Sequence, residues 1–251
     1  MREQADKAVG ARLGGAIRVL DVGGAGNVSR HATHVLDRLS YEWWQNWPQK
    51  GTTAIPTGHW VVHDICGAKP FPFPDKYFDF VICSHTLEDV RDPIRVCDEM
   101  SRVGKAGYIE TPSVLSELIW GRETAPWVGY CHHRWLVSVE DDTLVFRFKP
   151  HLVHSSPRFY FPARFGKILE EQDRAATCHF WSTQIACREE LDFLLSRESI
   201  EDYLESIVRS ESGENLSMLR HRVQQQIWRL GVGLTDRLGI RASLRALLWK
   251  R

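Results

Sequence analysis

The chain has 251 residues, of which 43% are hydrophobic and 25% charged, and its formal net charge is zero. These are ordinary values for a globular protein. The balanced charge argues against general nucleic-acid binding, which needs a basic surface. No apolar run approaches the roughly 18 residues that a membrane-spanning helix needs.

The cysteines and the first residues indicate a compartment. Six cysteines are spread singly, with no C-x-x-C pair, and Cys83 and Cys97 lie in apolar patterns typical of a core. Reduced, buried cysteines are usual in cytoplasmic proteins. The stretch "MREQADKAVGARLGG" lacks the apolar segment of a secretory signal. We therefore expect a cytoplasmic protein.

Short apolar runs in the first part of the chain predict the strands of a sheet. Each is bounded by Gly, Asp, Pro or Ser, as is typical of buried parallel strands. The runs are Arg18–Val22, Thr33–Leu36, His59–His63, Phe78–Cys83 and Ala106–Ile109. Helices are expected at 41–47 and after Asp92, which would cap a helix that starts at Pro93 and ends at Gly104. This alternation predicts a doubly wound α/β fold.

The later part of the chain changes character twice. Helices are expected from near Ser113 and from Pro162, and two longer strands over 143–155 and 178–187, antiparallel to each other at the sheet edge. These would complete a mostly parallel, seven-stranded sheet. From about Arg188, apolar residues recur at helical spacing. We therefore expect an α/β domain over 1–190 and an all-helical C-terminal extension over 191–251.

A glycine-rich turn follows the first predicted strand. Asp21 ends that strand, and Gly23, Gly24 and Gly26 come directly after it. Ligands of parallel α/β sheets bind at the carboxyl ends of the strands, where glycines let the backbone approach a ligand closely. Only about ten residues link the first two strands, near the lower limit for a parallel crossover. The link should therefore be a turn or a single helical turn.

Two further acids close the next two strands. Asp37 ends the second strand, and a carboxylate there can accept hydrogen bonds from both hydroxyl groups of a ribose. Asp64 ends the third strand and could accept a hydrogen bond from the exocyclic amine of an adenine, while Ile65 packs on the ring. The acids and the glycine turn together predict a site for a cofactor that carries adenosine.

Two cofactors compete for this site. The segment "GAGNVS" from Gly24 to Ser29 partly matches G-x-G-x-x-G, which favours a dinucleotide. A pyrophosphate, however, needs the N-terminus of a long helix, for which the turn has no room. Asp21 and Asp64 fit S-adenosylmethionine better.

The segments "VLDVGGAGN" (19–27) and "PFPFPDKYFDFVICSHTLEDVRDP" (70–93) resemble class I S-adenosylmethionine-dependent methyltransferases of the small-molecule "type 11" kind. The resemblance covers roughly residues 16–115. It implies a Rossmann-like methyltransferase fold and S-adenosylmethionine as cofactor. It also implies that the loop Ser84–Glu88 borders both the substrate and the methionine end of the cofactor. Ser84 is the residue of this loop expected to contact the cofactor. The chain departs from the family at Ala25, where glycine is usual, and at Asp89, where histidine is frequent.

Methyl transfer mainly requires that the nucleophile be held in line with the methyl group. A general base is needed only if the nucleophile must lose a proton, and the candidates are His85 and Glu110. In "GYCHHRW", adjacent histidines should point apart, so no metal site is predicted. Arg134 and Trp135 either line the site opposite the cofactor or serve ordinary structure.

The remaining expectations concern partners. The tail "DRLGIRASLRALLWKR" (236–251) predicts a basic amphipathic helix that packs on its neighbours or makes weak contact with a membrane surface. The apolar stripes of the extension could also pack across a homodimer. The acceptor stays open: a small molecule, a sugar or lipid-linked intermediate, or a protein. The alternatives to a methyltransferase are a non-catalytic S-adenosylmethionine-binding scaffold and an NAD-dependent oxidoreductase.

Overall fold

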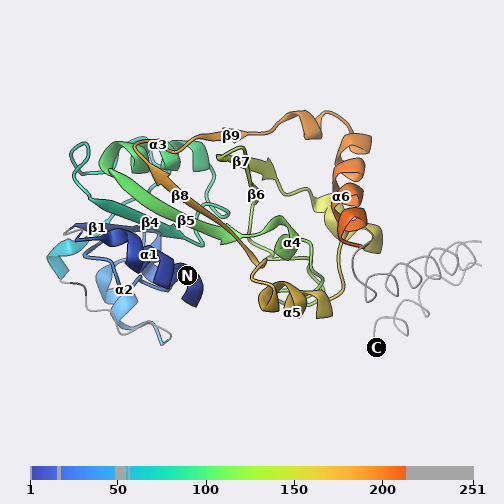
Figure 1. Cartoon of the computed structure of the whole chain (residues 1–251), viewed down its shortest axis with the longest axis horizontal. Helices are drawn as coiled ribbons and strands as arrows, with labels where there is room; N and C mark the ends of the chain where they lie inside the picture. The colour runs from blue at the N-terminus through green and yellow to red at the C-terminus, as the bar shows by residue number, and fades with distance from the viewer. Residues whose placement is uncertain (1, 16–17, 49–54, 56, 213–251) are drawn as a thin grey trace, which may run out of the picture.

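The computed structural model describes residues 2–15, 18–48, 55 and 57–212. Within them lies a six-stranded sheet of order β3-β2-β1-β4-β5-β8 (Figure 1). Neighbouring strands from β3 to β5 are parallel, and β8 runs antiparallel to β5. A second sheet has the order β6-β7-β9. The strands are β1 (Val19–Val22), β2 (His34–Asp37), β3 (Trp60–Val62), β4 (Phe80–Ser84), β5 (Ala106–Pro112), β6 (Trp135–Glu140), β7 (Thr143–Phe148), β8 (Ala176–Ser182) and β9 (Cys187–Glu189).

Helices and short 3-10 turns connect these strands. The α-helices are α1 (Glu3–Leu13), α2 (Tyr41–Gln45), α3 (Pro93–Val103), α4 (Val114–Glu117), α5 (Arg164–Glu171) and α6 (Arg197–Ser212). Helix α3 has the predicted limits: the Asp92 side chain accepts a hydrogen bond from the Arg95 N–H (3.0 Å), and Gly104 closes the last turn on the Met100 carbonyl. Such side-chain caps satisfy N–H groups that have no partner within the helix.

The main sheet is covered on both faces, because successive side chains of a strand point to opposite sides. Leu20 and Val22 of β1 pack with Met100 of α3 and with β6 and β7 of the second sheet. Val19, the neighbour of Leu20, packs on the other face with Val9 of α1. The prediction of a doubly wound, mostly parallel α/β fold is confirmed.

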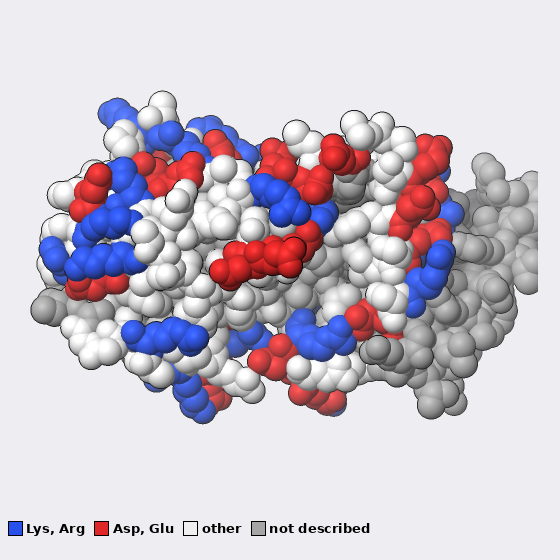
Figure 2. All heavy atoms as spheres, turned by 45° about the horizontal axis from the view of Figure 1, so that its top comes forward, with Lys and Arg blue, Asp and Glu red and all other residues white. Residues whose placement is uncertain are grey.

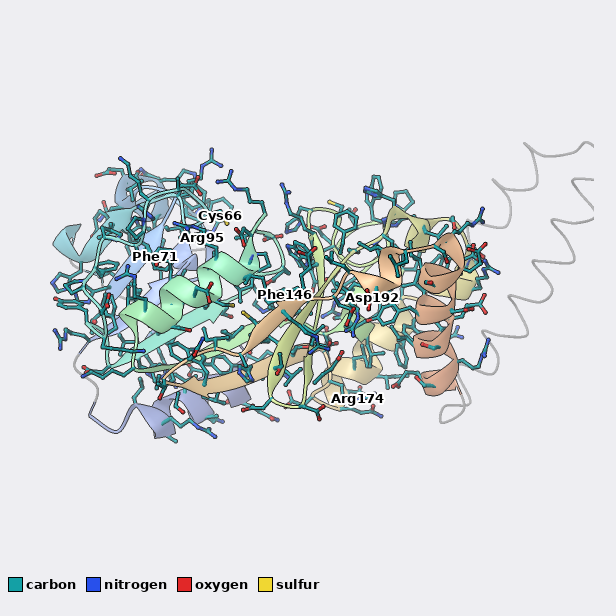
Figure 3. All side chains as sticks on the ribbon, turned by 90° about the horizontal axis from the view of Figure 1, so that it is seen from above. Cys66, Phe71, Arg95, Phe146, Arg174 and Asp192 are labelled. Carbon is teal, nitrogen blue, oxygen red and sulfur yellow. The ribbon has the colours of Figure 1, made fainter. Side chains whose placement is uncertain are left out.

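A separate core holds the helical end of the molecule. Buried residues of α4, α5 and α6 meet there with Phe159 and Phe161, away from the main sheet (Figure 1). Phe146 of β7 lies between α3 and this helical end (Figure 3) and belongs to the sheet's own core. The extension therefore begins with a helix that shares its core with residues 118–169.

The prediction for the later strands was wrong in its pairing. The segments over 143–155 and 178–187 were expected to pair with each other, but β7 and β8 lie in different sheets. β7 instead forms a hairpin with β6 through Asp141 and Asp142, both in left-handed conformations (φ 47° and 60°). Two such residues make the tight turn that suits the twist of a hairpin. The main sheet consequently has six strands among the described residues, not seven.

The extension is described only in part. Strand β9 precedes its predicted start at residue 191, and α6 is helical as expected. The basic tail 236–251 lies outside the described residues. In the described part of the chain, no helix is both long and apolar enough to cross a membrane.

Candidate functional site

The glycine turn is fixed by close packing. Gly23 adopts a left-handed conformation (φ 74°), and its N–H donates to the Leu36 carbonyl of β2 (2.9 Å). A Cβ on Gly23 would lie 2.4 Å from the Thr86 side chain, and one on Gly24 would lie 2.5 Å from the Asp21 carboxyl group. A Cβ on Gly26 would meet nothing within 4 Å. The 3-10 turn Gly24–Gly26 is the single helical turn expected between β1 and β2.

Asp21 supports this turn from beneath. Its buried carboxylate accepts a hydrogen bond from the Ser29 N–H (2.7 Å). Burial raises the pKa of Asp21 to about 7, the Ser29 hydrogen bond opposes this rise, and the nearby charge of Asp37 adds to it. Asp21 thus shapes the turn and does not line the cavity described below.

Asp37 and Asp64 come together because β2 and β3 are parallel neighbours. The buried Asp37 carboxylate accepts hydrogen bonds from the N–H groups of Ala25 (2.9 Å) and Leu39 (2.8 Å), one on each oxygen. A carboxylate has about four acceptor positions, so capacity remains for hydroxyl groups of a ligand. Asp64 is exposed, and its carboxylate accepts the Cys66 N–H (3.0 Å).

The loop that carries Asp64 and Ile65 is tied to α3. The Arg95 guanidinium donates to the carbonyl groups of Gly67 (2.9 Å) and Ala68 (3.1 Å). Figure 3 shows Arg95 close to Cys66 at this end of the sheet. Helix α3 therefore positions the end of β3 relative to β4.

A cavity of about 390 Å³ opens at the carboxyl ends of these strands. Its lining includes five of the ten predicted cofactor-binding and catalytic residues: Gly23, Asp37, Asp64, Ile65 and His85. Five other predicted residues are not in the lining: Asp21, Gly24, Gly26, Ser84 and Glu110. The predicted residues therefore divide evenly between those that line this cavity and those that lie outside its lining.

A larger cavity, of about 790 Å³, lies at the opposite ends of the strands. It is lined by Phe80 and Ala106, the first residues of β4 and β5, together with Arg12, His179 and Trp181. Parallel α/β sheets bind their ligands at the carboxyl ends of the strands. Position therefore favours the smaller cavity as the functional site.

Residues 20–109 match the family model described as a methyltransferase domain. This segment is a methyltransferase domain. The match covers β1 to most of β5 and therefore includes every predicted cofactor-binding residue. It confirms the resemblance to class I S-adenosylmethionine-dependent methyltransferases, and S-adenosylmethionine is the cofactor of the domain.

Solved structures resemble the chain over part of its length. The cyclase SpnF is 18% identical (TM-score 0.31), with 43% of this chain and 44% of that chain covered. An S-adenosylmethionine-dependent methyltransferase from Mesorhizobium loti is 17% identical (TM-score 0.36; 60% and 64% covered). One from Aquifex aeolicus is 19% identical (TM-score 0.27; 39% and 57% covered). The chain thus spans less than two thirds of each of these proteins. No curated protein matches it.

The cavity of the methyltransferase domain fits its cofactor. Asp37 offers acceptor positions for ribose hydroxyl groups, and Asp64 and Ile65 offer a carboxylate and an apolar surface for an adenine. The three-residue turn Gly24–Gly26 provides no long helix for a pyrophosphate. The residues present therefore suit S-adenosylmethionine better than NAD.

His85 lies in the cavity between two buried carboxylates. Its Nε2 is 3.3 Å from Glu110 Oε1, and its Nδ1 is 3.5 Å from Glu88 Oε1. Burial alone would lower the pKa of His85, but hydrogen bonds to Glu110 and Glu88 and their charges raise it to about 9. His85 is therefore protonated at neutral pH.

Glu110 is fully buried and heavily engaged. Its carboxylate accepts hydrogen bonds from the Tyr108 hydroxyl (2.7 Å), Ser84 Oγ (3.2 Å) and the Arg2 N–H (3.2 Å). Burial would raise the pKa of Glu110, but the hydrogen bonds from His85 and Tyr108 outweigh it and lower the pKa to about 2. Glu110 therefore does not line the cavity and influences it only through its contact with His85.

The other wall of the cavity comes from residues after β4 and before β6. Asp89 and Arg134 line it, which is one of the two alternatives for Arg134, and the Arg134 N–H donates to the Glu88 carbonyl (2.7 Å). Trp135 follows the other alternative, because it is buried, with its indole N–H on the Val90 carbonyl (2.7 Å). Burial, together with the charge of Glu88, raises the pKa of Asp89, while the charges of His133 and His132 oppose the rise.

The prediction that His132 and His133 point apart was wrong. Both Nε2 atoms approach Asp89 Oδ1, at 3.8 Å from His132 and 3.7 Å from His133. The argument assumed a strand or a helix, but residues 131–134 form an irregular loop before β6. In such a loop the backbone can turn adjacent side chains to the same side.

Further lining residues were not singled out from the sequence. They are Arg38, Cys66, Val90 and Arg91. Arg38 and Cys66 each lie within two residues of a predicted acid. Their position at the same strand ends could therefore have placed them in the site from the sequence alone. Val90 and Arg91 belong to the quoted segment 70–93, where only the loop Ser84–Glu88 was assigned to the site; Thr86 of that loop does line the cavity.

Proposed function

We propose that the protein transfers a methyl group from S-adenosylmethionine to an acceptor bound against His85, Asp89 and Arg134. The observation that supports this most is the composition of one cavity. Asp37, Asp64 and Ile65 form a wall suited to adenosine, and the remaining lining includes His85, Asp89 and Arg134, which this wall does not use. A scaffold that only stored the cofactor would have no use for this second wall.

In this mechanism the domain binds the cofactor and the acceptor and orients them relative to each other. When bound, S-adenosylmethionine supplies a methyl group already activated by a sulfonium centre. Asp37 holds the ribose, Asp64 and Ile65 hold the adenine, and the turn after β1 lets the backbone approach the cofactor. Rate enhancement then comes from holding the acceptor in line with the methyl group and excluding water.

We assign neither His85 nor Glu110 the role of general base. A base must be able to accept a proton at working pH, whereas His85 is protonated and Glu110 is buried with its oxygens engaged. In the proposed reaction His85, whose two N–H groups face Glu110 and Glu88, lines the acceptor side of the cavity as a fixed polar surface, and Glu110 positions His85. The acceptor is therefore a group that is nucleophilic before any proton is removed, or one that loses its proton to solvent.

The charges on the second wall favour an acceptor with an anionic group. Among the described residues, the exposed Arg134 side chain forms no ion pair, and the protonated His85 lies in the same cavity. A planar guanidinium recognises carboxylate and phosphate groups well. On the face shown in Figure 2, acidic and basic side chains are interspersed.

Calorimetry of the full chain with S-adenosylmethionine and with NAD tests the cofactor. We expect binding of the former only. Asp37→Asn should weaken it at least tenfold, because hydrogen bonds to a charged group are worth about 1.5–3 kcal/mol each. Asp98→Asn, on the exposed side of α3, should bind as the parent does. Binding of NAD alone would overturn the proposal.

Transfer of a labelled methyl group tests the reaction. Acceptors that carry a carboxylate or phosphate group should be methylated faster than their neutral analogues. Binding of S-adenosylmethionine without transfer to any acceptor would favour the non-catalytic scaffold.

A further inference from the structure

A cluster of metal-ligating side chains adjoins the cavity. Asp89 Oδ1, His132 Nε2 and His133 Nε2 converge from the loops after β4 and before β6, and one ligand atom from each lies within 4.8 Å of the others. Asp89 Oδ1 is buried and accepts no hydrogen bond from any described residue. Ligand atoms about 2.0–2.1 Å from a tetrahedral ion lie about 3.3 Å apart. Small side-chain shifts would therefore bring these three atoms onto one ion.

The Nδ1 atom of each histidine, on the side of the ring away from Asp89, faces a carboxylate. His133 Nδ1 is 2.5 Å from Glu117 Oε1, and His132 Nδ1 is 3.4 Å from Glu123 Oε1. A histidine that donates its Nδ1 proton to a carboxylate keeps its Nε2 lone pair free, and metal-binding histidines usually have such a partner. In their neutral form, with the proton on Nδ1, both histidines would direct the Nε2 lone pair toward Asp89.

The His133 arrangement is rigid and buried. Only 5% of the His133 side chain is exposed, and its ring stacks on Tyr130 at 4.4 Å between ring centres. Glu117, itself buried, is held by Lys149 Nζ (2.7 Å), which also donates to the Tyr130 carbonyl (2.8 Å). The position of the Nε2 atom is therefore set by packing before any ligand binds.

We propose that Asp89, His132 and His133 bind a divalent transition metal ion, with an open coordination position directed to the cavity. Two imidazoles and one carboxylate are typical of Zn²⁺ sites that keep a position for water or substrate, and of Fe²⁺ sites. Mg²⁺ prefers oxygen ligands alone. Because Asp89 lines the cofactor cavity, the ion would offer its open position to an oxygen atom of the acceptor.

A second group of ligating residues shares His132. Glu123, Cys131 and His132 also lie close together, but all three are exposed. The Glu123 carboxylate already accepts the Cys131 N–H (3.0 Å). The buried His133 and the unpartnered Asp89 oxygen favour the first group.

Equilibrium dialysis of the tag-free full chain, first stripped with a chelator, tests the site. With Zn²⁺ as the probe, we expect one tightly bound ion per chain, and no comparable binding of Mg²⁺. Loss of an outer carboxylate typically costs 10–100-fold in affinity, so His132→Gln and Asp89→Asn should each cost at least about 100-fold. Co²⁺ in place of Zn²⁺ should show the visible absorption of a low-symmetry site, which the same variants should lose.

Two controls and the circular dichroism of each variant complete the test. Cys131→Ser and His151→Gln should bind Zn²⁺ as the parent does, because Cys131 belongs to the other group and His151 is exposed elsewhere. The His132 side chain is half exposed, so its variant should fold even if the Asp89 variant does not. Absence of binding in the parent, parent-like binding in His132→Gln, or equal binding of Mg²⁺ would each overturn the proposal. Loss of binding in Cys131→Ser would overturn the ligand set.

Discussion

At the scale of single residues, the pKa values of two buried carboxylates in the same sheet are shifted in opposite directions. Asp21 receives one backbone N–H, and burial raises its pKa to about 7. Glu110 receives a hydroxyl group and a protonated histidine, and its pKa falls to about 2. The number and charge of the donors decides the outcome, since both side chains are almost entirely buried. Asp21 therefore shapes the turn but costs stability when it is ionised, whereas Glu110 is a stable negative charge behind His85.

Asp21→Asn should stabilise the protein above neutral pH. A folded-state pKa raised from 3.8 to about 7 means that the folded protein holds a proton which the unfolded chain releases at lower pH. The stabilisation from this group is complete below about pH 4 and is lost as pH rises to 7, and the whole shift corresponds to about 4 kcal/mol at most. Denaturant unfolding at pH 5 and pH 8 measures it. A variant less stable than the parent at pH 8 would contradict the assignment.

His85→Gln should remove a pH dependence on the basic side. The folded-state pKa of His85 is raised from 6.5 to about 9, chiefly by Glu110 and Glu88 against the effect of burial. Its contribution to the free energy of unfolding is complete below pH 6.5 and is lost as pH rises through 9. Glutamine carries the same backbone cost at this left-handed position (φ 55°). Unfolding followed from pH 6 to pH 10 should show the loss in the parent only; equal profiles would exclude the ion pairs.

At the scale of elements, the turn after β1 separates two uses of glycine. Gly24 rests on the Asp21 carboxyl group, whereas the space beside Gly26 is open. A glycine with no neighbour is not required by packing of the protein itself. Gly26 lies outside the lining of the cavity, and contact with the cofactor remains the role predicted for it from the sequence.

Gly24→Ala and Gly26→Ala form a matched pair. Alanine at 24 should lower the free energy of unfolding by about 1–3 kcal/mol through overpacking, and weaken S-adenosylmethionine binding as a result. Alanine at 26 should leave stability within about 0.5 kcal/mol of the parent but still weaken the cofactor. Unfolding and calorimetry on both variants check this split. Unchanged affinity in Gly26→Ala would remove Gly26 from the cofactor site.

The elements that could be predicted are those whose sequence patterns allow one reading. The five parallel strands are uniformly apolar and bounded by turn residues, and α3 carries its own cap, proline and glycine stop. The second sheet could not be placed, because the mixed polarity of 143–148 suits several edge positions and the Asp141–Asp142 hairpin was not recognised. The His132 and His133 geometry was missed since irregular loops have no side-chain period from which direction could be inferred.

At the scale of the whole molecule, the helical end has a core of its own, separate from the cores around the main sheet. The cofactor cavity stands on the core of the main sheet, whereas Leu204 and Val208 of α6 pack with residues 118–169 in the other core. The core of the helical end contains none of the three residues proposed to hold the adenosine, Asp37, Asp64 and Ile65. Changes deep in the helical end should therefore affect stability without changing cofactor affinity.

Leu204→Ala tests this division. Leu204 is fully buried, so its truncation should cost about 2–5 kcal/mol of unfolding free energy, with S-adenosylmethionine affinity unchanged at a temperature where the variant is folded. Leu195→Ala removes the same atoms from a side chain that is 79% exposed and should cost less than about 0.5 kcal/mol. Calorimetry and thermal unfolding of the two variants decide the matter. A parallel loss of cofactor affinity in Leu204→Ala would show that the cores are coupled.

The position of β8 has a consequence during synthesis. β5 ends at Pro112, but the strand that covers its free edge is complete only at Ser182. At roughly 5–20 residues per second, the ribosome needs several seconds to make the intervening segment. Throughout that interval the nascent sheet presents an uncovered edge, which is a template for pairing with other chains. The antiparallel strand thus acts as a late closure, and chains released before it is made should be the species that chaperones retain.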